Sequence, residues 1–168
     1  MRSLLTFGCS FTQYRWPTWA NIISKDFDQF HNWGYPGAGN SYIFNSLIES
    51  VKRDQIIKDD TVIIMWTTVA REDRYDDSVY ASETIEIDQA IKDLYSEELS
   101  SIESSIYEVV FDCKWWSRDE LKPNLPDDHP TPVEHLMYID QVIPQFTVKQ
   151  GVRDLVNFID QDIKLDKP

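Results

Sequence analysis

Two short segments near opposite ends of the chain carry residues that can do nucleophilic chemistry. Near the start, an apolar run leads into Gly8-Cys9-Ser10, and near the end Asp127 and Asp128 precede His129. A hydroxyl or thiol at a strand-to-helix turn lies close to a helix N-terminus, which favours developing negative charge. An imidazole can take up its proton, and a nearby carboxylate can fix the imidazole tautomer. These residue types therefore predict a nucleophile with a histidine base.

The choice of base is narrow, because the chain has only three histidines, His31, His129 and His135. His129 lies in a predicted loop before a proline and a capped helix, where a rigid scaffold can position a site residue. His135 falls inside that helix and is interpreted as a surface or packing residue, and His31 as structural or exposed. The alternative interpretation of residues 127–129 is a solvated turn with no chemical role.

A third segment, Asn32-Trp33-Gly34-Tyr35-Pro36-Gly37, follows a predicted short strand. Together with Gly8-Cys9-Ser10 and His129-Pro130, this segment resembles the conserved blocks of the SGNH (GDSL-like) hydrolase family. The resemblance covers about a quarter of the chain, and its three parts occur in the family's order. It implies a compact variant of the family's three-layer α/β/α sandwich, with a parallel, flavodoxin-like sheet.

The same resemblance implies a serine hydrolase of the esterase or deacetylase type that forms an acyl-enzyme. Ser10 would be the nucleophile, His129 the base and Asp127 the acid of the triad. The amides of Gly37 and Ser10 would form the oxyanion hole, where preorganised donors contribute strongly to rate. No metal or organic cofactor is needed for this chemistry.

The chain departs from the family pattern at three places. Cys9 stands where the family has Asp, and Pro126 stands three residues before His129, where the family has the triad acid. Asp127 is preferred over Asp128, since adjacent side chains point apart in extended backbone. The family's oxyanion asparagine is replaced by Thr68, and Asn40 is a second candidate for that role. These departures keep open a catalytically degenerate binding module on the same fold.

Two further alternatives use the same residues differently. Cys9 could be the nucleophile, because a helix N-terminus lowers a thiol pKa. A metal site could use Asp127, Asp128, His129 and His135, but no second cluster supplies further ligands. We therefore expect no bound metal.

The substrate is expected to be a small-molecule or saccharide acyl ester. Trp33 and Tyr35 could line its pocket, as could Trp115 and Trp116, although packing is the commoner fate of such aromatic side chains. Arg71, just past a predicted strand, could meet an anionic group on the substrate or form a salt bridge. Nothing in the sequence selects the acyl group or the oligomeric state.

Composition limits the function classes. The 168 residues have a formal net charge of −13, which disfavours nucleic acid and anionic membranes as partners. Neither of the two cysteines, Cys9 and Cys113, belongs to a disulfide framework or a zinc motif, and no segment has the length and apolarity of a signal peptide or a membrane span. We expect one domain over residues 1–168 in a cytoplasmic protein.

Apolar periodicity predicts alternating strands and helices, the pattern of a parallel α/β sheet. The continuous apolar run 61–67 is typical of a strand buried on both faces, whereas Thr131-Pro-Val-Glu134 is a capping box. Strands are predicted over 4–7, 30–33 and 61–67. Helices are predicted over 16–27, from Asn40 or Ser41 to 51, and over 87–102, 131–143 and 148–159, with a frayed tail over 161–168. Residues 106–111 fit a strand or a continuation of the helix over 87–102, and a strand is preferred.

Overall fold

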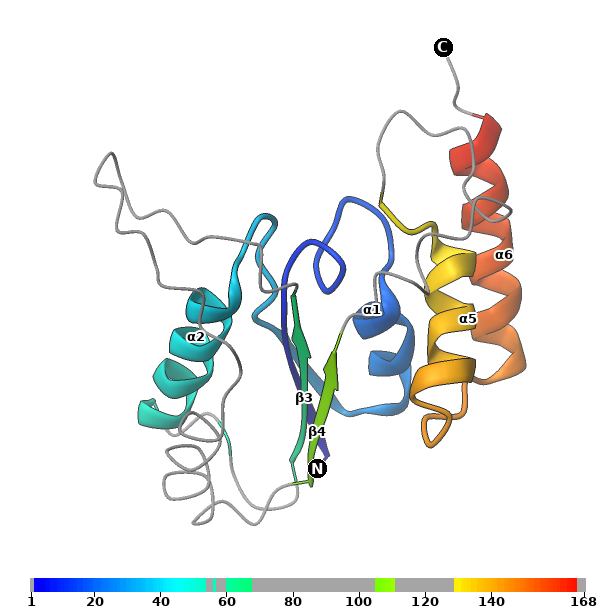
Figure 1. Cartoon of the computed structure of the whole chain (residues 1–168). Helices are drawn as coiled ribbons and strands as arrows, with labels where there is room; N and C mark the ends of the chain where they lie inside the picture. Colours follow the sequence, from blue (N-terminus) through cyan, green and yellow to red (C-terminus); the bar gives the residue numbers. More distant parts are fainter. Residues whose placement is uncertain (1, 54–55, 57–59, 68–104, 111–128, 166–168) are drawn as a thin grey trace.

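The structure is a computed structural model and describes residues 2–53, 56, 60–67, 105–110 and 129–165 (Figure 1). The predictions for Arg71, for the helix over 87–102 and for Trp115 and Trp116 fall outside these residues.

The strands of the described residues form one parallel sheet. They are β1 (Ser3–Phe7), β2 (Gln29–Asn32), β3 (Thr61–Trp66) and β4 (Ser105–Val110). Their order is β2-β1-β3-β4, and every pairing is parallel. The chain therefore runs from β1 to β2 at one edge, then returns past β1 to β3 and continues to β4, and this reversal of direction is typical of doubly wound α/β folds.

Helices cover both faces of this sheet (Figure 1). On one face lies α2 (Asn40–Lys52), and on the other lie α1 (Trp19–Ile23), α5 (Pro132–Val142) and α6 (Gln150–Leu165). A short 3₁₀ turn, η1 (Ser24–Asp26), extends α1. The prediction of a three-layer α/β/α sandwich with a parallel sheet is confirmed. None of the described helices is long and apolar enough to cross a membrane.

The central strand β3 is apolar throughout because helices cover both of its faces. Ile63 and Met65 pack with α1, α5 and α6, whereas Val62 and Ile64 pack with α2. Successive side chains of a strand point to opposite faces, so a strand with helices on both sides must be apolar at every position. The strand predicted over 106–111 is likewise confirmed as β4.

The N-terminal boundary of the first helix was predicted wrongly. The helix begins at Trp19 rather than Trp16, because Thr18 is its N-cap and the preceding residues make long-range contacts. The Trp16 indole Nε1 donates a hydrogen bond to the Pro130 carbonyl at 2.6 Å, and the Thr18 hydroxyl donates to the Thr12 carbonyl at 2.7 Å. A regular helix from Trp16 would break this arrangement.

The C-terminal helix pair is fixed by its caps and by ion pairs. The capping box is confirmed, since the Thr131 amide donates to the Glu134 carboxylate at 2.7 Å and the Glu134 amide donates to the Thr131 hydroxyl. The predicted fraying is wrong for residues 161–165, because α6 continues to Leu165, and residues 166–168 lie outside the described residues. Its strong amphipathicity favours burial of one stripe against α5.

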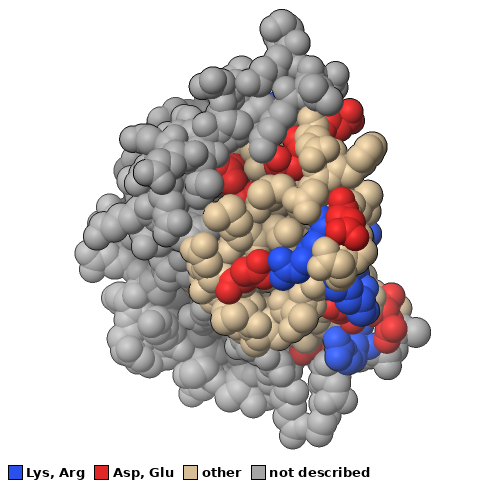
Figure 2. Space-filling view, turned by 90° about the vertical axis from the view of Figure 1, so that its right-hand side faces the viewer, with Lys and Arg blue, Asp and Glu red and all other residues tan. Residues whose placement is uncertain are grey.

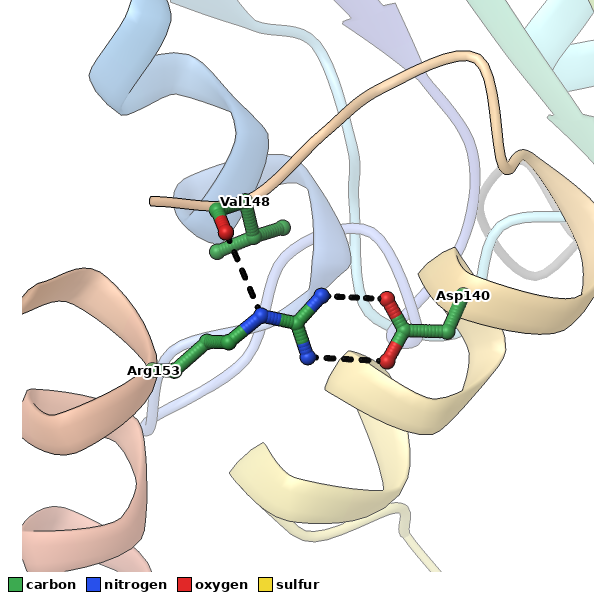
Figure 3. Close-up of polar contacts among 3 residues, drawn as sticks. All are labelled: Asp140, Val148 and Arg153. Atoms are coloured by element: carbon green, nitrogen blue, oxygen red, sulfur yellow. Dashed lines mark hydrogen bonds and ion pairs between the residues drawn. The ribbon is translucent and has the colours of Figure 1, made fainter. Parts of the chain in front are cut away.

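Arg153 ties α6 to α5 by a bidentate contact (Figure 3). Its guanidinium donates to both Asp140 carboxylate oxygens, at 2.9 and 2.5 Å, and its Nε donates to the Val148 carbonyl at 3.2 Å. The hydrogen bond from Arg153 lowers the pKa of the Asp140 carboxyl. Basic and acidic side chains lie next to one another on this face of the molecule (Figure 2).

Candidate active site

Ser10 lies in the tight turn that follows β1. The Thr12 and Gln13 amides both donate to the Cys9 carbonyl, at 2.9 and 3.2 Å, which closes the turn. Because β1 sits between β2 and β3, the turn stands at the point where the crossover direction reverses. In open α/β sheets, ligands bind at this carboxyl edge, so the predicted nucleophile occupies the position that the topology favours.

Gly8 permits this turn to close. A Cβ atom at Gly8 would lie 2.0 Å from the Thr12 hydroxyl oxygen and 3.2 Å from the Met65 carbonyl oxygen. The turn therefore folds back on the end of β1 so closely that no side chain fits there.

The second predicted block hydrogen-bonds to the same turn. The Asn32 side-chain amide donates to the Thr12 carbonyl at 3.0 Å, while its oxygen accepts from the Gly34 amide at 2.9 Å. The Tyr35 amide donates to the Gly8 carbonyl at 3.0 Å. This bridging role of Asn32 was not predicted from the sequence, where the asparagine counted only as part of a motif.

Gly37 adopts a left-handed backbone, with φ of +87°, and a Cβ there would meet no atom within 4 Å. Glycine is therefore favoured at this position by conformation and not by crowding. The Ala38 amide donates to the Tyr35 carbonyl at 3.0 Å, which closes a turn around Pro36 and Gly37. The turn leaves Gly37 exposed.

Asn40 connects this loop to the end of β3. Its side-chain nitrogen donates to the Thr67 carbonyl at 3.1 Å, and its oxygen accepts from the Thr67 amide at 2.9 Å. All of these groups are buried, so the pair satisfies backbone groups where the ladder of β3 ends. Because Asn40 is engaged in this way, Gly39 serves as the N-cap of α2 instead of Asn40 or Ser41. Thr68, the other oxyanion candidate, is outside the described residues.

The structure brings His129 to the turn that carries Ser10. The His129 ring stacks on Tyr14, with centroids 4.0 Å apart and planes 9° apart, and lies 5.5 Å from the Phe11 ring. The hydrogen bond from Trp16 to the Pro130 carbonyl holds the next residue. Tyr14 and Trp16 also contact each other edge to face at 4.7 Å. Neither side chain was predicted to belong to the site.

The other histidines and Cys9 have different surroundings. His135 is buried in α5, and burial together with the electrostatic interaction with His129 lowers its pKa from 6.5 to about 3. Of the two roles predicted for His135, surface or packing, the structure therefore shows packing, with a neutral imidazole. His31 is exposed on β2. The Cys9 thiol is fully buried in the layer under α2, which disfavours the cysteine-nucleophile alternative because a reactive thiol needs access.

The two described aromatic residues that were predicted to line the substrate pocket have different surroundings. Trp33 stacks on Phe7 at 6.1 Å as part of the packing under α2, whereas Tyr35 is 58% exposed and lies 5.3 Å from the Tyr42 ring. Asp127, the predicted triad acid, and its alternative Asp128 lie outside the described residues, as does Arg71. The described part of the site therefore comprises Ser10, the loop from Asn32 to Asn40, and His129.

Comparison with known proteins gives limited similarity. No family model matches the chain, and no curated protein matches it by sequence. Among solved structures, the chain is similar to a member of the lipolytic protein G-D-S-L family from Veillonella parvula DSM 2008. The two share 14% sequence identity and a TM-score of 0.49, over 85% of this chain and 99% of the other.

Proposed function

We propose that this chain is a serine hydrolase that cleaves acyl esters, with Ser10 as nucleophile and His129 as general base. One observation carries the proposal: the His129 ring packs against Phe11 and Tyr14, within four residues of Ser10 on the same turn. A hydroxyl and an imidazole held at the carboxyl edge of a parallel sheet suit nucleophilic acyl transfer. The proposal assigns no role to a metal or an organic cofactor.

In the first half of the proposed reaction, Ser10 Oγ attacks the ester carbonyl carbon while His129 takes the hydroxyl proton. The tetrahedral intermediate collapses, the bond to the leaving oxygen breaks, and His129 gives its proton to the departing alcohol. Water then attacks the acyl-enzyme, with its proton taken by His129. Ser10 leaves with a proton from His129, and the carboxylic acid is released. Asp127 is proposed to accept the second imidazole N–H.

The oxyanion is proposed to be held by the amides of Ser10 and Gly37, with Asn40 or Thr68 as a further donor. An Asn side-chain nitrogen carries two protons. Since one proton of Asn40 is directed to the Thr67 carbonyl, the other can serve a substrate oxygen at the same loop. This double use of Asn40 would couple the oxyanion hole to the end of β3.

The substrate class remains a small-molecule or saccharide acyl ester. Exposed Tyr35 is the described aromatic residue best placed to contact it, because it stands on the loop that carries Gly37. Of the other candidates, Trp33 contributes instead to packing against Phe7, and Arg71, Trp115 and Trp116 lie outside the described residues.

A binding module without turnover is the second candidate. Ser10 is only 4% exposed, and a nucleophile must be reached by its substrate. The low exposure of Ser10 therefore favours a protein that keeps Ser10 and His129 together on this fold but does not hydrolyse esters.

Hydrolysis of p-nitrophenyl acetate and butyrate by purified protein tests the proposal. Ser10→Ala and His129→Ala should each lower kcat/KM by roughly a thousandfold or more, since triad members act as a unit. Ser46→Ala on α2 and His31→Ala on β2 are matched controls and should retain activity, and circular dichroism checks that each variant is folded. Turnover that survives Ser10→Ala would contradict the assignment, and turnover lost only in Cys9→Ala would transfer it to the thiol.

A further inference from the structure

One long-range hydrogen bond connects the loop of the proposed nucleophile to the loop of the proposed base. The Trp16 indole Nε1 donates to the Pro130 carbonyl at 2.6 Å, across 114 residues of sequence, and both residues are buried. Trp16 lies six residues after Ser10, and Pro130 directly follows His129. The segment between β1 and α1 accordingly runs beside the start of α5 (Figure 1). The bond therefore ties the segment that carries the hydroxyl to the segment that carries the imidazole.

The loop on the nucleophile side is closed at its ends. The Thr18 hydroxyl donates to the Thr12 carbonyl at 2.7 Å, and Thr12 lies only two residues after Ser10. Trp16 stands within the closed loop, where its ring meets the Tyr14 ring edge to face with centroids 4.7 Å apart. The position of the Trp16 ring is thus fixed relative to the turn that presents Ser10.

The loop on the base side is stiff because of its proline and the helix cap that follows. Proline has a fixed φ angle of about −65°, and the residue before it is restricted to extended backbone. The Pro130 carbonyl is therefore connected to the Cα atom of His129 through few free torsions. Beyond Pro130, Thr131 caps α5, and its amide donates to the Glu134 carboxylate at 2.7 Å. A hydrogen bond to the Pro130 carbonyl consequently sets where the imidazole stands.

Aromatic contacts give a second connection between the same residues. Tyr14 contacts Trp16 edge to face, and it stacks on the His129 ring with centroids 4.0 Å apart. A shift of Trp16 would therefore reach His129 along two routes, the Pro130 backbone and the Tyr14 ring. Such shifts are costly at a reacting pair, because a misplacement of about 1 Å lowers a rate by roughly a hundredfold.

We propose that Trp16 is a positioning residue that sets the distance between Ser10 Oγ and the His129 imidazole, through its indole hydrogen bond to the Pro130 carbonyl. This inference rests on the proposed function, because it assigns Trp16 a part in that reaction. The rival explanation is that the indole only satisfies a buried carbonyl, which needs a donor in any fold. In that case, loss of the donor would lower stability and leave the activity of the folded protein unchanged.

Three variants separate the two explanations. Trp16→Phe keeps an aromatic ring and removes the donor. Trp19→Phe is the matched control, since Trp19 is also buried but its indole Nε1 meets no hydrogen-bond partner among the described residues. In Trp16→His, the imidazole Nε2 takes the ring position of the indole Nε1, so that a donor is restored on a smaller ring.

Hydrolysis of p-nitrophenyl butyrate is measured at a temperature where circular dichroism shows that every variant is folded. Trp16→Phe should lower kcat roughly ten- to hundredfold with KM unchanged, because the proposed ester contacts do not include Trp16. Trp19→Phe should stay within about twofold of wild type, and kcat of Trp16→His should exceed that of Trp16→Phe by about threefold or more. A wild-type kcat in folded Trp16→Phe, or an equal loss in Trp16→Phe and Trp16→His, would overturn the proposal.

The His129 resonances in proton–carbon NMR spectra, assigned by comparison with His129→Ala, give a readout that needs no turnover. The stacked Tyr14 ring should shift the His129 ring protons of the wild type upfield, because protons over an aromatic face are shielded. Trp16→Phe should remove most of this shift, whereas Trp19→Phe and Trp16→His should keep it. An unchanged shift in Trp16→Phe would overturn the proposal even if esters are hydrolysed.

The two readouts also separate this proposal from the proposed function. If no version hydrolyses esters but the His129 shifts follow the expected pattern, the placement of His129 by Trp16 stands and the hydrolase proposal falls. If Trp16→Phe does not fold, Trp16→His is tested by itself. A folded Trp16→His protein without the upfield shift at His129 would overturn the proposal.

Discussion

The Tyr14 ring lies flat against the His129 imidazole, with centroids 4.0 Å apart and planes 9° apart. Tyr14 stands four residues after Ser10, so the segment that presents the proposed nucleophile also presents the surface on which the proposed base rests. An aromatic face attracts a cation, and it would therefore stabilise the imidazolium that forms when His129 takes up a proton. Stacking also limits rotation of the imidazole ring.

Tyr14→Ala should lower ester hydrolysis by roughly two- to tenfold, the range expected for loss of one aromatic pair. Tyr14→Phe should retain most of the activity, because it keeps the stacked ring and removes only the hydroxyl. The apparent pKa of the base in the pH–rate profile should fall in Tyr14→Ala and stay in place in Tyr14→Phe. Equal loss in both variants would mean that the hydroxyl, and not the stacking, matters.

Asn40→Ala should destabilise the fold by about 1–3 kcal/mol, since it leaves the buried amide and carbonyl of Thr67 without the partners described above. Asn45→Ala, on the exposed side of the same helix, is the matched control and should change stability little. Urea unfolding followed by tryptophan fluorescence measures both. A difference between the two variants of less than about 0.5 kcal/mol would show that the connection from the loop to β3 contributes nothing measurable.

Gly8→Ala should destabilise the chain by about 1–3 kcal/mol or prevent folding, because the added Cβ would overlap Thr12. Gly151→Ala is the opposite case. Gly151 lies in α6 with no atom within 4 Å of an added Cβ, so alanine should stabilise the helix by about 0.5–1 kcal/mol. Thermal unfolding of the two variants should therefore move in opposite directions. A Gly8→Ala protein as stable as wild type would show that the turn is not closed as described.

His135 should make the fold sensitive to acid. The folded-state pKa of about 3 lies below the ordinary value of 6.5, so between these values the unfolded chain takes up a proton that the folded chain does not. The contribution of a neutral His135 is complete above pH 6.5 and is lost as the pH falls toward 3, with a slope of up to about 1.4 kcal/mol per pH unit. His135→Gln should reduce that slope in urea unfolding measured from pH 7 to 4, whereas His31→Gln should leave it unchanged. Identical slopes in wild type and His135→Gln would contradict the burial of a neutral imidazole.

Much of the fold could be predicted from local patterns. The apolar run of β3 and the capping box at Thr131 were identified correctly because each depends on neighbouring residues only. The start of α1 could not be predicted, since it depends on a hydrogen bond from Trp16 to Pro130, which is 114 residues away in the sequence. The end of α6 was misjudged because polar residues after 160 resemble a frayed tail when the helix they continue is unknown.

The site residues stay a prediction, and the sequence could name only those that belong to short local motifs. Ser10, Gly37 and His129 lie in short motifs that can be read along the chain. Asn32, Asn40 and Tyr14 act through contacts with segments distant in sequence, and an asparagine or tyrosine in a loop carries no sequence signal for such a contact. Structure was needed to show which polar atoms meet.

The most direct test of the central claim is covalent labelling with a fluorophosphonate, followed by mass spectrometry of the digested protein. The account predicts one adduct, on the Ser10 hydroxyl, that forms in wild type and in Ser46→Ala and is lost in His129→Ala. Labelling should also be slowed by an excess of p-nitrophenyl butyrate. A folded wild-type protein that forms no adduct on Ser10, or an adduct that forms equally well in His129→Ala, would contradict the proposed nucleophile and base.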